Sequence, residues 1–591
     1  MTDKSGARAS EQPMIKPDGE NPRIAYFSME IGLESDIHTY AGGLGVLAGD
    51  ILRSAADLAV PMIGVTLVYR QGHFNQELDP AGNQLESPHP WSPEEKLEPL
   101  AERVSVEIEG RTVHLRTWLY RIIGEGGFEV PVLLLDSQLP ENTAGDQALT
   151  DQLYGGDARY RLCQEAILGL GGAALLRELG YNADLLYHMN EGHSSLLTLA
   201  LLEEKAGVVG HETVSTESIQ WVKERCVFTT HTPVAAGHDR FPVDLVEQVL
   251  GPLRAEALRE MGQLTEGTLN MTHLGLDGSR YVNGVAMRHA EVSREMFPDY
   301  TIDVITNGAH VDTWTSEPIQ KLFDRHIPRW RHDKRRLRYA IRIPLEEIRE
   351  AHQRAKTELV AEIGGRTGVQ FAEDALTLGF ARRATGYKRA DLLLQDVERL
   401  RGIAREVGPL QVVYAGRAHP QDSQGKAMIQ RIVEIAGSLG DEVKVVYLAG
   451  YDMELAKLLV SGVDVWLNTP LRPREASGTS GMKAAFNGVP NLSVLDGWWV
   501  EGHIEGVTGW SLLDPGDSPD DADRELAALY DKLEQEVMPL YYQRPAKFAE
   551  MMRSAIALNA SFFNTQRVVS QYVRNAYCWH GSRASYCGSF G

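Results

Sequence analysis

The chain has 591 residues, with 59 Lys and Arg against 81 Asp and Glu, so its formal net charge is −22. Hydrophobic residues make up 43% and charged residues 24%, which is a globular composition, and the length predicts at least two domains with a core each. An acidic protein repels phosphate backbones and anionic headgroups, which excludes general nucleic-acid binding and attachment to an anionic membrane surface. Two basic clusters, at residues 381–384 (ARRA) and 386–389 (GYKR), stand out against this charge and need an explanation.

The cysteines and the N-terminal segment indicate the cellular compartment. The four cysteines have no CxxC spacing and are too few for a disulfide framework, which favours a reducing environment: Cys163, Cys226, Cys578 and Cys587. Residues 1–23 are polar and lack the apolar core of a signal peptide, and no apolar run approaches the roughly 20 residues that span a bilayer. We therefore expect a soluble, cytoplasmic protein that does not contact a membrane.

Histidine spacing gives no sign of a metal site. His188 and His193 flank a turn, and the sequence between them does not form an HExxH helix. We interpret both as polar pocket or loop residues and predict no bound metal.

In the first half of the chain, short apolar runs alternate with helical patterns. Residues 1–22 have no periodicity and predict a flexible arm. Strands are expected at 23–29, 61–69, 130–136, 184–189, 226–230 and 302–305, a hairpin at 104–115, and helices at 46–58, 158–179 and 193–205.

The second half repeats one strand–helix unit. Strands at 376–380, 410–414, 443–448 and 463–467 precede helices at 387–405, 423–437, 452–461 and 478–487, and a strand at 491–495 follows. Such units form a parallel sheet with helices on both faces. We predict an α/β protein with two doubly wound, Rossmann-like domains that face each other across a cleft, at 23–330 and 331–545. The charged helical stretch 331–364 links them, and helices with a loose Ser-, Gly- and Cys-rich tail complete the chain at 546–591.

Unusual residues follow the predicted strands directly. In the first half these are residues 42–45 (GGLG), 190–193 (NEGH), 231–233 (HTP) and 307–308 (NG). In the second half they are Arg382, Arg383, Lys388, residues 416–417, Tyr451 and residues 475–479. Ligands of open α/β sheets bind beyond the carboxyl ends of the strands, so this placement predicts one shared binding region.

The glycine run 42–45 opens a helix, where free backbone N–H groups can bind an anion. It also resembles a GxGxxA dinucleotide fingerprint, which requires an acidic residue at the end of the next strand. That strand ends Val68-Tyr69-Arg70, so we reject NAD binding.

Arg383 and Lys388 stand five residues apart across a strand-to-helix turn that Gly386 allows to bend closely. Two cations that converge there suit an oxyanion such as phosphate. Solvated residues at the start of a helix are the alternative, and the glycine run in the other half favours the phosphate interpretation.

Residues 475–483 (EASGTSGMK) carry the most information. Small residues and hydroxyls at the start of a helix form an anion cradle, and Lys483 follows one turn later. A lysine on an apolar helix is usually a surface residue whose ammonium reaches water, whereas a desolvated lysine can form a Schiff base with an aldehyde cofactor. Spacing alone leaves both open.

Together these motifs carry a family resemblance. The chain resembles the α-glucan phosphorylases (glycogen, starch and maltodextrin phosphorylases), which are retaining glycosyltransferases of the two-domain GT-B type that bind pyridoxal phosphate. The resemblance lies in residues 26–30 (YFSME), 40–45 (YAGGLG), 72–76 (GHFNQ), 190–193 (NEGH), 282–286 (VNGVA), 305–308 (ITNG), 383–388 and 475–483, in the family's order over about residues 23–510.

The resemblance implies an α-1,4-glucan phosphorylase that releases glucose 1-phosphate reversibly from the non-reducing end of glycogen, starch or maltodextrin. It implies that pyridoxal phosphate forms a Schiff base with Lys483 and that Tyr451 packs beside the cofactor. The cofactor's phosphate acts as the acid–base relay, and the residues that cradle it are Arg382, Gly478, Thr479 and Ser480. The catalytic residues it implies are Arg383, Lys388, His231 and Glu475, and the further substrate-binding residues are Gly43, Asn190, His193 and Asn307. Arg383, Lys388 and the Gly43 N–H bind inorganic phosphate; the others bind or line the glucosyl site. A homodimer is expected by family analogy alone.

The chain departs from the long members of the family. It has Thr-Ser-Gly-Met-Lys where many have Thr-Gly-Asn-Met-Lys, and Ala384-Thr385-Gly386 replaces bulkier residues. It resembles the short bacterial or archaeal branch, for which we expect no phosphorylation or nucleotide regulation.

Two other functions remain open from sequence. A nucleotide-sugar glycosyltransferase such as a glycogen synthase would have no use for Lys483 as a Schiff-base residue. A non-catalytic glucan-binding protein would not need Arg383 and Lys388, which are both present.

Overall fold

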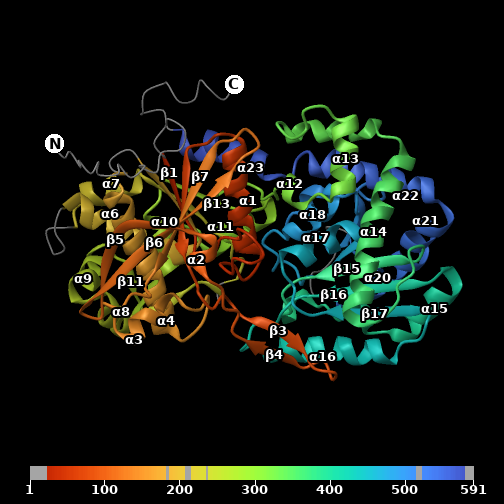
Figure 1. The fold of residues 1–591 in the computed structure, drawn as a ribbon, viewed down its shortest axis with the longest axis horizontal. Helices are drawn as coiled ribbons and strands as arrows, with labels where there is room; N and C mark the ends of the chain where they lie inside the picture. The colour runs from red at the N-terminus through yellow and green to blue at the C-terminus, as the bar shows by residue number, and fades with distance from the viewer. Residues whose placement is uncertain (1–22, 182–184, 207–213, 235–236, 514–521, 579–591) are drawn as a thin grey trace, which may run out of the picture.

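A computed structural model describes residues 23–181, 185–206, 214–234, 237–513 and 522–578. The predicted arm at 1–22 and the tail from 579 lie outside the described residues. The chain forms two α/β halves, each built on a mostly or wholly parallel sheet with helices packed against it, side by side in Figure 1. The predicted α/β fold class is confirmed.

The first sheet has nine strands in the order β14-β13-β9-β8-β1-β2-β7-β6-β5. The first seven in this order are parallel: β14 (Asp303–Val304), β13 (Tyr281–Gly284), β9 (Cys226–Thr229), β8 (Leu186–Asn190), β1 (Ile24–Phe27), β2 (Met62–Leu67) and β7 (Glu129–Asp136). The predicted hairpin, β5 (Glu98–Ile108) and β6 (Arg111–Ile123), extends the sheet in antiparallel fashion. Helix α1 (Gly43–Asp57) follows β1, and α4 (Ala158–Ala166) runs through a π-helical turn into α5 (Gly172–Glu178), before α6 (Leu196–Ala206).

The second sheet has six parallel strands in the order β17-β16-β15-β18-β19-β20. The strands are β15 (Leu376–Ala381), β16 (Leu410–Ala415), β17 (Val443–Leu448), β18 (Val465–Asn468), β19 (Asn491–Ser493) and β20 (Gly509–Ser511). The intervening helices are α15 (Val397–Val407), α16 (Ser423–Ser438), α17 (Met453–Gly462) and α18 (Thr479–Phe486). Counted along the chain, this is the 3-2-1-4-5-6 order of a doubly wound nucleotide-binding sheet.

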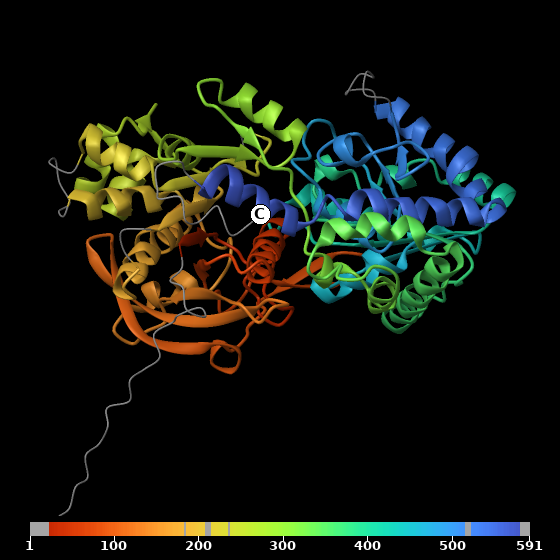
Figure 2. The ribbon, with the colours of Figure 1, turned by 90° about the horizontal axis from the view of Figure 1, so that it is seen from above.

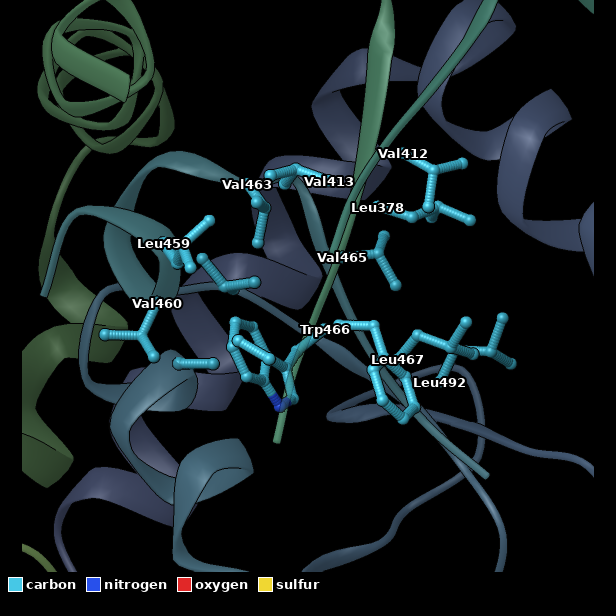
Figure 3. Packing of buried hydrophobic residues seen from close by; sticks show 14 of the residues in the cluster. Leu378, Val412, Val413, Leu459, Val460, Val463, Val465, Trp466, Leu467 and Leu492 are labelled. Carbon is cyan, nitrogen blue, oxygen red and sulfur yellow. The ribbon is translucent and has the colours of Figure 1, made fainter. Parts of the chain in front are cut away.

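Consecutive apolar residues of the strands build the second core. Figure 3 shows Val412, Val465 and Trp466 of the strands packed with Leu459 and Val460 of α17. Both faces of such a parallel strand are covered, so the strands read as continuous apolar runs in the sequence, and this explains why they were predictable.

One predicted helix is wrong in part. The pattern predicted a helix over 387–405, but the structure has two 3-10 turns, Gly386–Lys388 and Leu392–Leu394, and an α-helix only from Val397. Arg389 adopts a left-handed backbone conformation with φ of 47°, which interrupts the helix, and the Asp396 side chain accepts a hydrogen bond from Arg399 N to begin a new one.

The chain crosses between the two halves twice. Residues 309–330, including α13 (Glu317–His326), pack into the core of the second half, ahead of the long α14 (Leu345–Thr367). After α20 (Ala522–Lys532) and α22 (Pro545–Ser554), the chain returns to the first half, where α23 (Thr565–Tyr572) packs beside α1, as Figure 2 shows. The domain boundaries at 330 and 545 stay a prediction.

The hairpin of β3 (Asn75–Leu78) and β4 (Gln84–Ser87) reaches from the first half to the second, where it lies beside α16 (Figure 1). Gln76 Nε2 donates to the Gly416 carbonyl and Gln84 Nε2 to the Ala418 carbonyl, each at 2.9 Å. Among the described residues, no helix is both long and apolar enough to span a bilayer.

Candidate active site

Most of the functional residues predicted from sequence lie in loops at the point where the strand order of each sheet reverses; His231, Asn307 and Tyr451 follow other strands. In the second half this point lies between β15 and β18, whose following loops carry residues 382–388 and 475–483. In the first half it lies between β1 and β8, whose following loops carry residues 28–42 and 191–195. Doubly wound sheets bind ligands at such switch points.

Contacts between the halves join these two regions. Met453 N donates to the Tyr40 hydroxyl at 3.2 Å, and Arg417 Nη1 donates to the Phe74 carbonyl at 2.7 Å. Val46 of α1 belongs to the core of the second half. The predicted sites of the two halves therefore lie next to each other.

Glu475 is the centre of an ion-pair cluster in the second half. Its Oε2 accepts from Arg382 Nη2 at 2.6 Å and also from Lys388 Nζ, and all three side chains are about nine-tenths buried. Burial alone would raise the pKa of Glu475, but the charges of Arg382 and Lys388 outweigh burial and lower it to about 2. The cluster holds two cations and one anion, and Arg382 Nη1 has no partner in the described part of the chain.

Arg383 does not join this cluster. Its side chain is exposed, and its charge acts on Glu30 and His73 of the first half. The sequence paired Arg383 with Lys388, whereas the structure pairs Lys388 with Arg382 through Glu475. Arg383 is thus left open to an anion from solvent.

The predicted anion cradle is a turn that leads into α18. Gly478 has a φ of 82° and would strain any other residue, and Ser477 Oγ is buried without a partner among the described residues. Ser480 Oγ accepts from Trp466 Nε1 at 3.2 Å, and Thr479 is the first residue of the helix. The first N–H groups of a helix have no acceptor within it and suit an anion.

A buried aspartate, Asp496, accepts hydrogen bonds from the backbone at the start of this turn. Asp496 Oδ2 accepts from Glu475 N at 2.8 Å, and Oδ1 accepts from Gly497 N at 2.9 Å. Burial raises the pKa of Asp496 to about 7. Sequence reasoning missed this residue, since a single Asp after a strand carries no pattern.

Lys483 is buried, with 7% of its surface exposed, so the surface-lysine alternative is wrong. Its Nζ lies 3.6 Å from the centre of the Trp314 ring, and Trp314 Nε1 donates to Asp50 Oδ2 at 2.8 Å. Burial lowers the pKa of Lys483 to about 8. With this pKa about a tenth of the amine is unprotonated at pH 7, far more than of an ordinary lysine, and the unprotonated amine is the nucleophile. Trp314 and Asp50 were not predicted, because they lie far from Lys483 in sequence.

In the first half, the structure brings Asn190 and His231 together. His231 Nε2 and Asn190 Oδ1 lie 2.7 Å apart, and Asn190 Nδ2 donates to Ser28 Oγ at 3.1 Å. Burial lowers the pKa of His231 to about 3, so the ring is neutral. His193 is buried close by, and its Nε2 has no partner in the described ranges. Neutral rings and amides are suited to hydrogen bonds with sugar hydroxyls.

The glycine loop is held by Glu30, whose Oε2 accepts from Ala41 N at 2.6 Å and Gly42 N at 3.2 Å. A Cβ on Gly45 would lie 2.8 Å from that oxygen, which explains the glycine there. A Cβ on Gly43 would meet nothing within 4 Å, so packing does not require this glycine. Gly43 is exposed as the first residue of α1, where backbone N–H groups have no acceptor within the helix.

Asn307 and Tyr451 complete the set of predicted residues. Asn307 is buried, and its main chain is fixed by Asn307 N donating to Val285 O and Arg567 Nη2 donating to Asn307 O, each at 2.9 Å. The carbonyl of half-buried Tyr451 accepts from Arg417 Nε at 3.1 Å.

One histidine–carboxylate group among the described residues has donor atoms within 4.8 Å of one another: Asp57, His310 and Asp312. The Lys334 ammonium already pairs with Asp312, and His310 Nε2 bonds to Asp57 Oδ2 at 2.9 Å. These contacts explain the group as an ion-pair cluster.

Fold and site together define a two-domain α/β enzyme of the GT-B type, with a buried amine and a buried ion-pair cluster in the loops at one switch point. A family model described as carbohydrate phosphorylase matches residues 28–119 and 251–507, which is more than half of the chain. The chain belongs to the carbohydrate phosphorylase family and is a glycosyltransferase.

Curated relatives agree with this assignment. Maltodextrin phosphorylase of Thermococcus litoralis is 39% identical over 95% of this chain and 71% of its own length. Glycogen phosphorylase of Aquifex aeolicus is 36% identical over 94% of this chain and 86% of its own length. Glycogen phosphorylase of Mycobacterium tuberculosis is 36% identical over 94% of this chain and 70% of its own length.

Proposed function

We propose that the protein is an α-1,4-glucan phosphorylase. It transfers the non-reducing-end glucosyl unit of a glucan to inorganic phosphate, reversibly and with retention, and forms glucose 1-phosphate. The relatives named above support the reaction. The observation that carries it in this chain is Lys483, a buried amine in the same segment, 475–483, as Glu475, which is the centre of a cluster with an excess of positive charge. A nucleotide-sugar transferase would have no use for such an amine.

The residues around Lys483 fit pyridoxal phosphate. The amine has a pKa of about 8 because it is buried, and Arg382 Nη1 and Ser477 Oγ are buried polar atoms without partners in the described chain. We propose that Lys483 carries the cofactor, that Arg382, Gly478, Thr479 and Ser480 hold its phosphate, and that Tyr451 packs beside it. When bound, this cofactor supplies a phosphate group that exchanges a proton with the substrate phosphate.

The protein's own groups bind the substrates. Exposed Arg383, Lys388 and the Gly43 N–H would bind inorganic phosphate, because two phosphates side by side repel each other unless cations offset their charge. His231, Glu475 and Asn307 would hydrogen-bond the glucosyl unit, with Asn190 and His193 lining its pocket. The cations would hold the negatively charged substrate phosphate beside the glucosyl carbon, where it stabilises the positive charge that develops on that carbon in the transition state. No pair of carboxylates in acid and nucleophile roles is needed.

The test is an assay of the purified protein with inorganic phosphate and maltodextrin, glycogen or starch. We expect α-glucose 1-phosphate, and borohydride treatment followed by peptide mass analysis is expected to place the reduced cofactor on Lys483. Glucosyl transfer from a nucleotide sugar without phosphorolysis would refute the proposal. We also propose a homodimer in the cytoplasm; light scattering tests the dimer.

A further inference from the structure

We propose that Glu191 is a positioning residue, whose buried carboxylate fixes His231 against Asn190. This inference rests on the proposed function, because it assigns His231 to the glucosyl pocket. Glu191 would act through His231 without touching the substrate.

The backbone of Glu191 is strained. It follows β8 with φ of 82° and ψ of 166°, a region that is essentially restricted to glycine. The next residue is Gly192, which has no positive φ. A glycine at 191 would remove the strain at no steric cost, so the side chain of Glu191 has to offset it.

The Glu191 carboxylate makes the contacts that explain this strain. Oε2 accepts from His231 N at 2.7 Å and from Thr232 Oγ1 at 2.9 Å, while Oε1 accepts from Gly192 N at 3.1 Å. The residue is only 8% exposed, so these hydrogen bonds form away from solvent. They join the loop after β8 to the loop after β9.

His231 depends on these bonds because residues 231–234 belong to no helix or strand. The Glu191 carboxylate therefore anchors the first residue of this loop, His231, through its backbone N–H, while His289 bonds to the backbone of the next residue, Thr232. Truncation of Glu191 would let the ring leave Asn190 without unfolding the sheet.

The neighbouring hydrogen bonds also select the tautomer of His231. Ser28 Oγ donates to the Glu30 carbonyl at 2.8 Å, so it accepts from Asn190 Nδ2. Asn190 Oδ1 is then the acceptor for His231 Nε2–H. His231 Nδ1 remains an acceptor for a donor such as a sugar hydroxyl, provided that the ring stays in this place.

The test compares Glu191→Gln and Glu191→Gly with the wild type, and uses Glu266→Gly as the matched control. Glu266 also has a positive φ, of 51°, but it is exposed in the turn between β11 (Leu264–Thr265) and β12 (Thr268–Asn270). We expect Glu191→Gly to raise the KM for maltodextrin about tenfold and to leave the KM for phosphate within about twofold. Glu191→Gln keeps one acceptor oxygen and should fall between, and Glu266→Gly should match the wild type.

Amide hydrogen exchange at His231 provides a readout that needs no activity. We expect exchange of this N–H to accelerate in Glu191→Gly and to stay unchanged in Glu266→Gly. Absence of phosphorolysis by the wild-type protein would refute the proposed function. The exchange data would still test whether Glu191 anchors the His231 backbone. Unchanged exchange at His231, or equal rises in both KM values with a lower Tm, would overturn the inference.

Discussion

At the scale of single residues, the site is governed by how each buried charge is balanced. Glu475 and Glu505 both have a pKa lowered to about 2, against burial that would raise it, but their surroundings differ. Glu475 is about nine-tenths buried between two cations, whereas the Glu505 side chain is 42% exposed beside His503 and Lys532. Solvent screens the interactions of Glu505 with His503 and Lys532, so the same lowered pKa corresponds to a smaller contribution to stability there than at Glu475.

Glu475→Gln tests this difference. The change leaves two buried cations without their anion, and we expect a loss of about 3 kcal/mol in the free energy of unfolding at pH 7. Phosphate should restore more stability to this variant than to the wild type, because it replaces the missing charge. Urea denaturation with and without phosphate measures both effects. Glu505→Gln is the control, with a loss below about 1 kcal/mol and no rescue by phosphate. Equal behaviour of the two variants would contradict this account.

The amine of Lys483 predicts a pH dependence of cofactor loading. Because burial lowers its pKa to about 8, the reactive free amine accumulates as the pH rises through 8. Incubation of cofactor-free protein with pyridoxal phosphate, followed by borohydride, should give half-maximal labelling of Lys483 near that pH. Lys96 is the internal control, because its hydrogen bond to Asp36 raises its pKa. Labelling of both lysines with the same pH midpoint would refute the prediction.

At the scale of elements, sequence predicts what repeats locally. Five strands of the second sheet, β15 to β19, are apolar runs that were predicted, and each lies within a few residues of its predicted bounds; the short β20 was not predicted. The prediction failed in the first part of 387–405, where Arg389 takes a left-handed conformation that no periodicity reveals. The same limit applied to the site: residues of one local motif were predicted, and residues brought in by the tertiary fold were not. Lys483 and Glu475 belong to one motif, whereas Trp314 and Asp496 reach the site only through the tertiary fold, so sequence spacing could not assign them a role.

Gly308 connects the site to the last helix. A Cβ there would lie 2.4 Å from the carbonyl carbon of Asn564, the N-cap of α23. Ala309 N donates to Phe563 O, and Thr565 N donates to Ala309 O, so this segment runs beside the start of the helix.

Gly308→Ala should therefore push α23 away and displace the adjacent Asn307. We expect a loss of about 1–3 kcal/mol in the free energy of unfolding and a higher KM for glucan. Gly365→Ala is the matched control, because that glycine lies inside α14 with nothing within 4 Å of an added Cβ. The control should gain up to about 1 kcal/mol from helix propensity. Urea denaturation of both variants measures these changes. An unchanged free energy of unfolding in Gly308→Ala would show that the backbone at Asn564 can move aside without loss of stability, and would contradict the prediction.

At the scale of the whole molecule, net charge and local charge have opposite signs. The chain carries −22, yet the cluster around Glu475 combines two cations with one carboxylate. Arg383 adds a third, exposed cation near it in sequence. The acidic balance therefore disfavours a long phosphate backbone on the surface but permits a single phosphate at the switch point of the second sheet.

This arrangement predicts an unusual salt dependence. At an ionic strength of about 10 mM the Debye length is about 30 Å, so the negative surface repels an approaching phosphate; at about 100 mM it falls to about 10 Å and the repulsion is screened. Lys388 and Arg382 are less than a tenth exposed, so their attraction is screened far less. We expect the Kd of phosphate for the cofactor-loaded enzyme to fall about two- to threefold over this range, the reverse of an exposed basic site. Calorimetry in sodium chloride and in sodium acetate separates screening from competition by the salt anion, and the KM for neutral maltodextrin should not change. A Kd that rises with both salts would show that exposed cations such as Arg383 dominate phosphate binding.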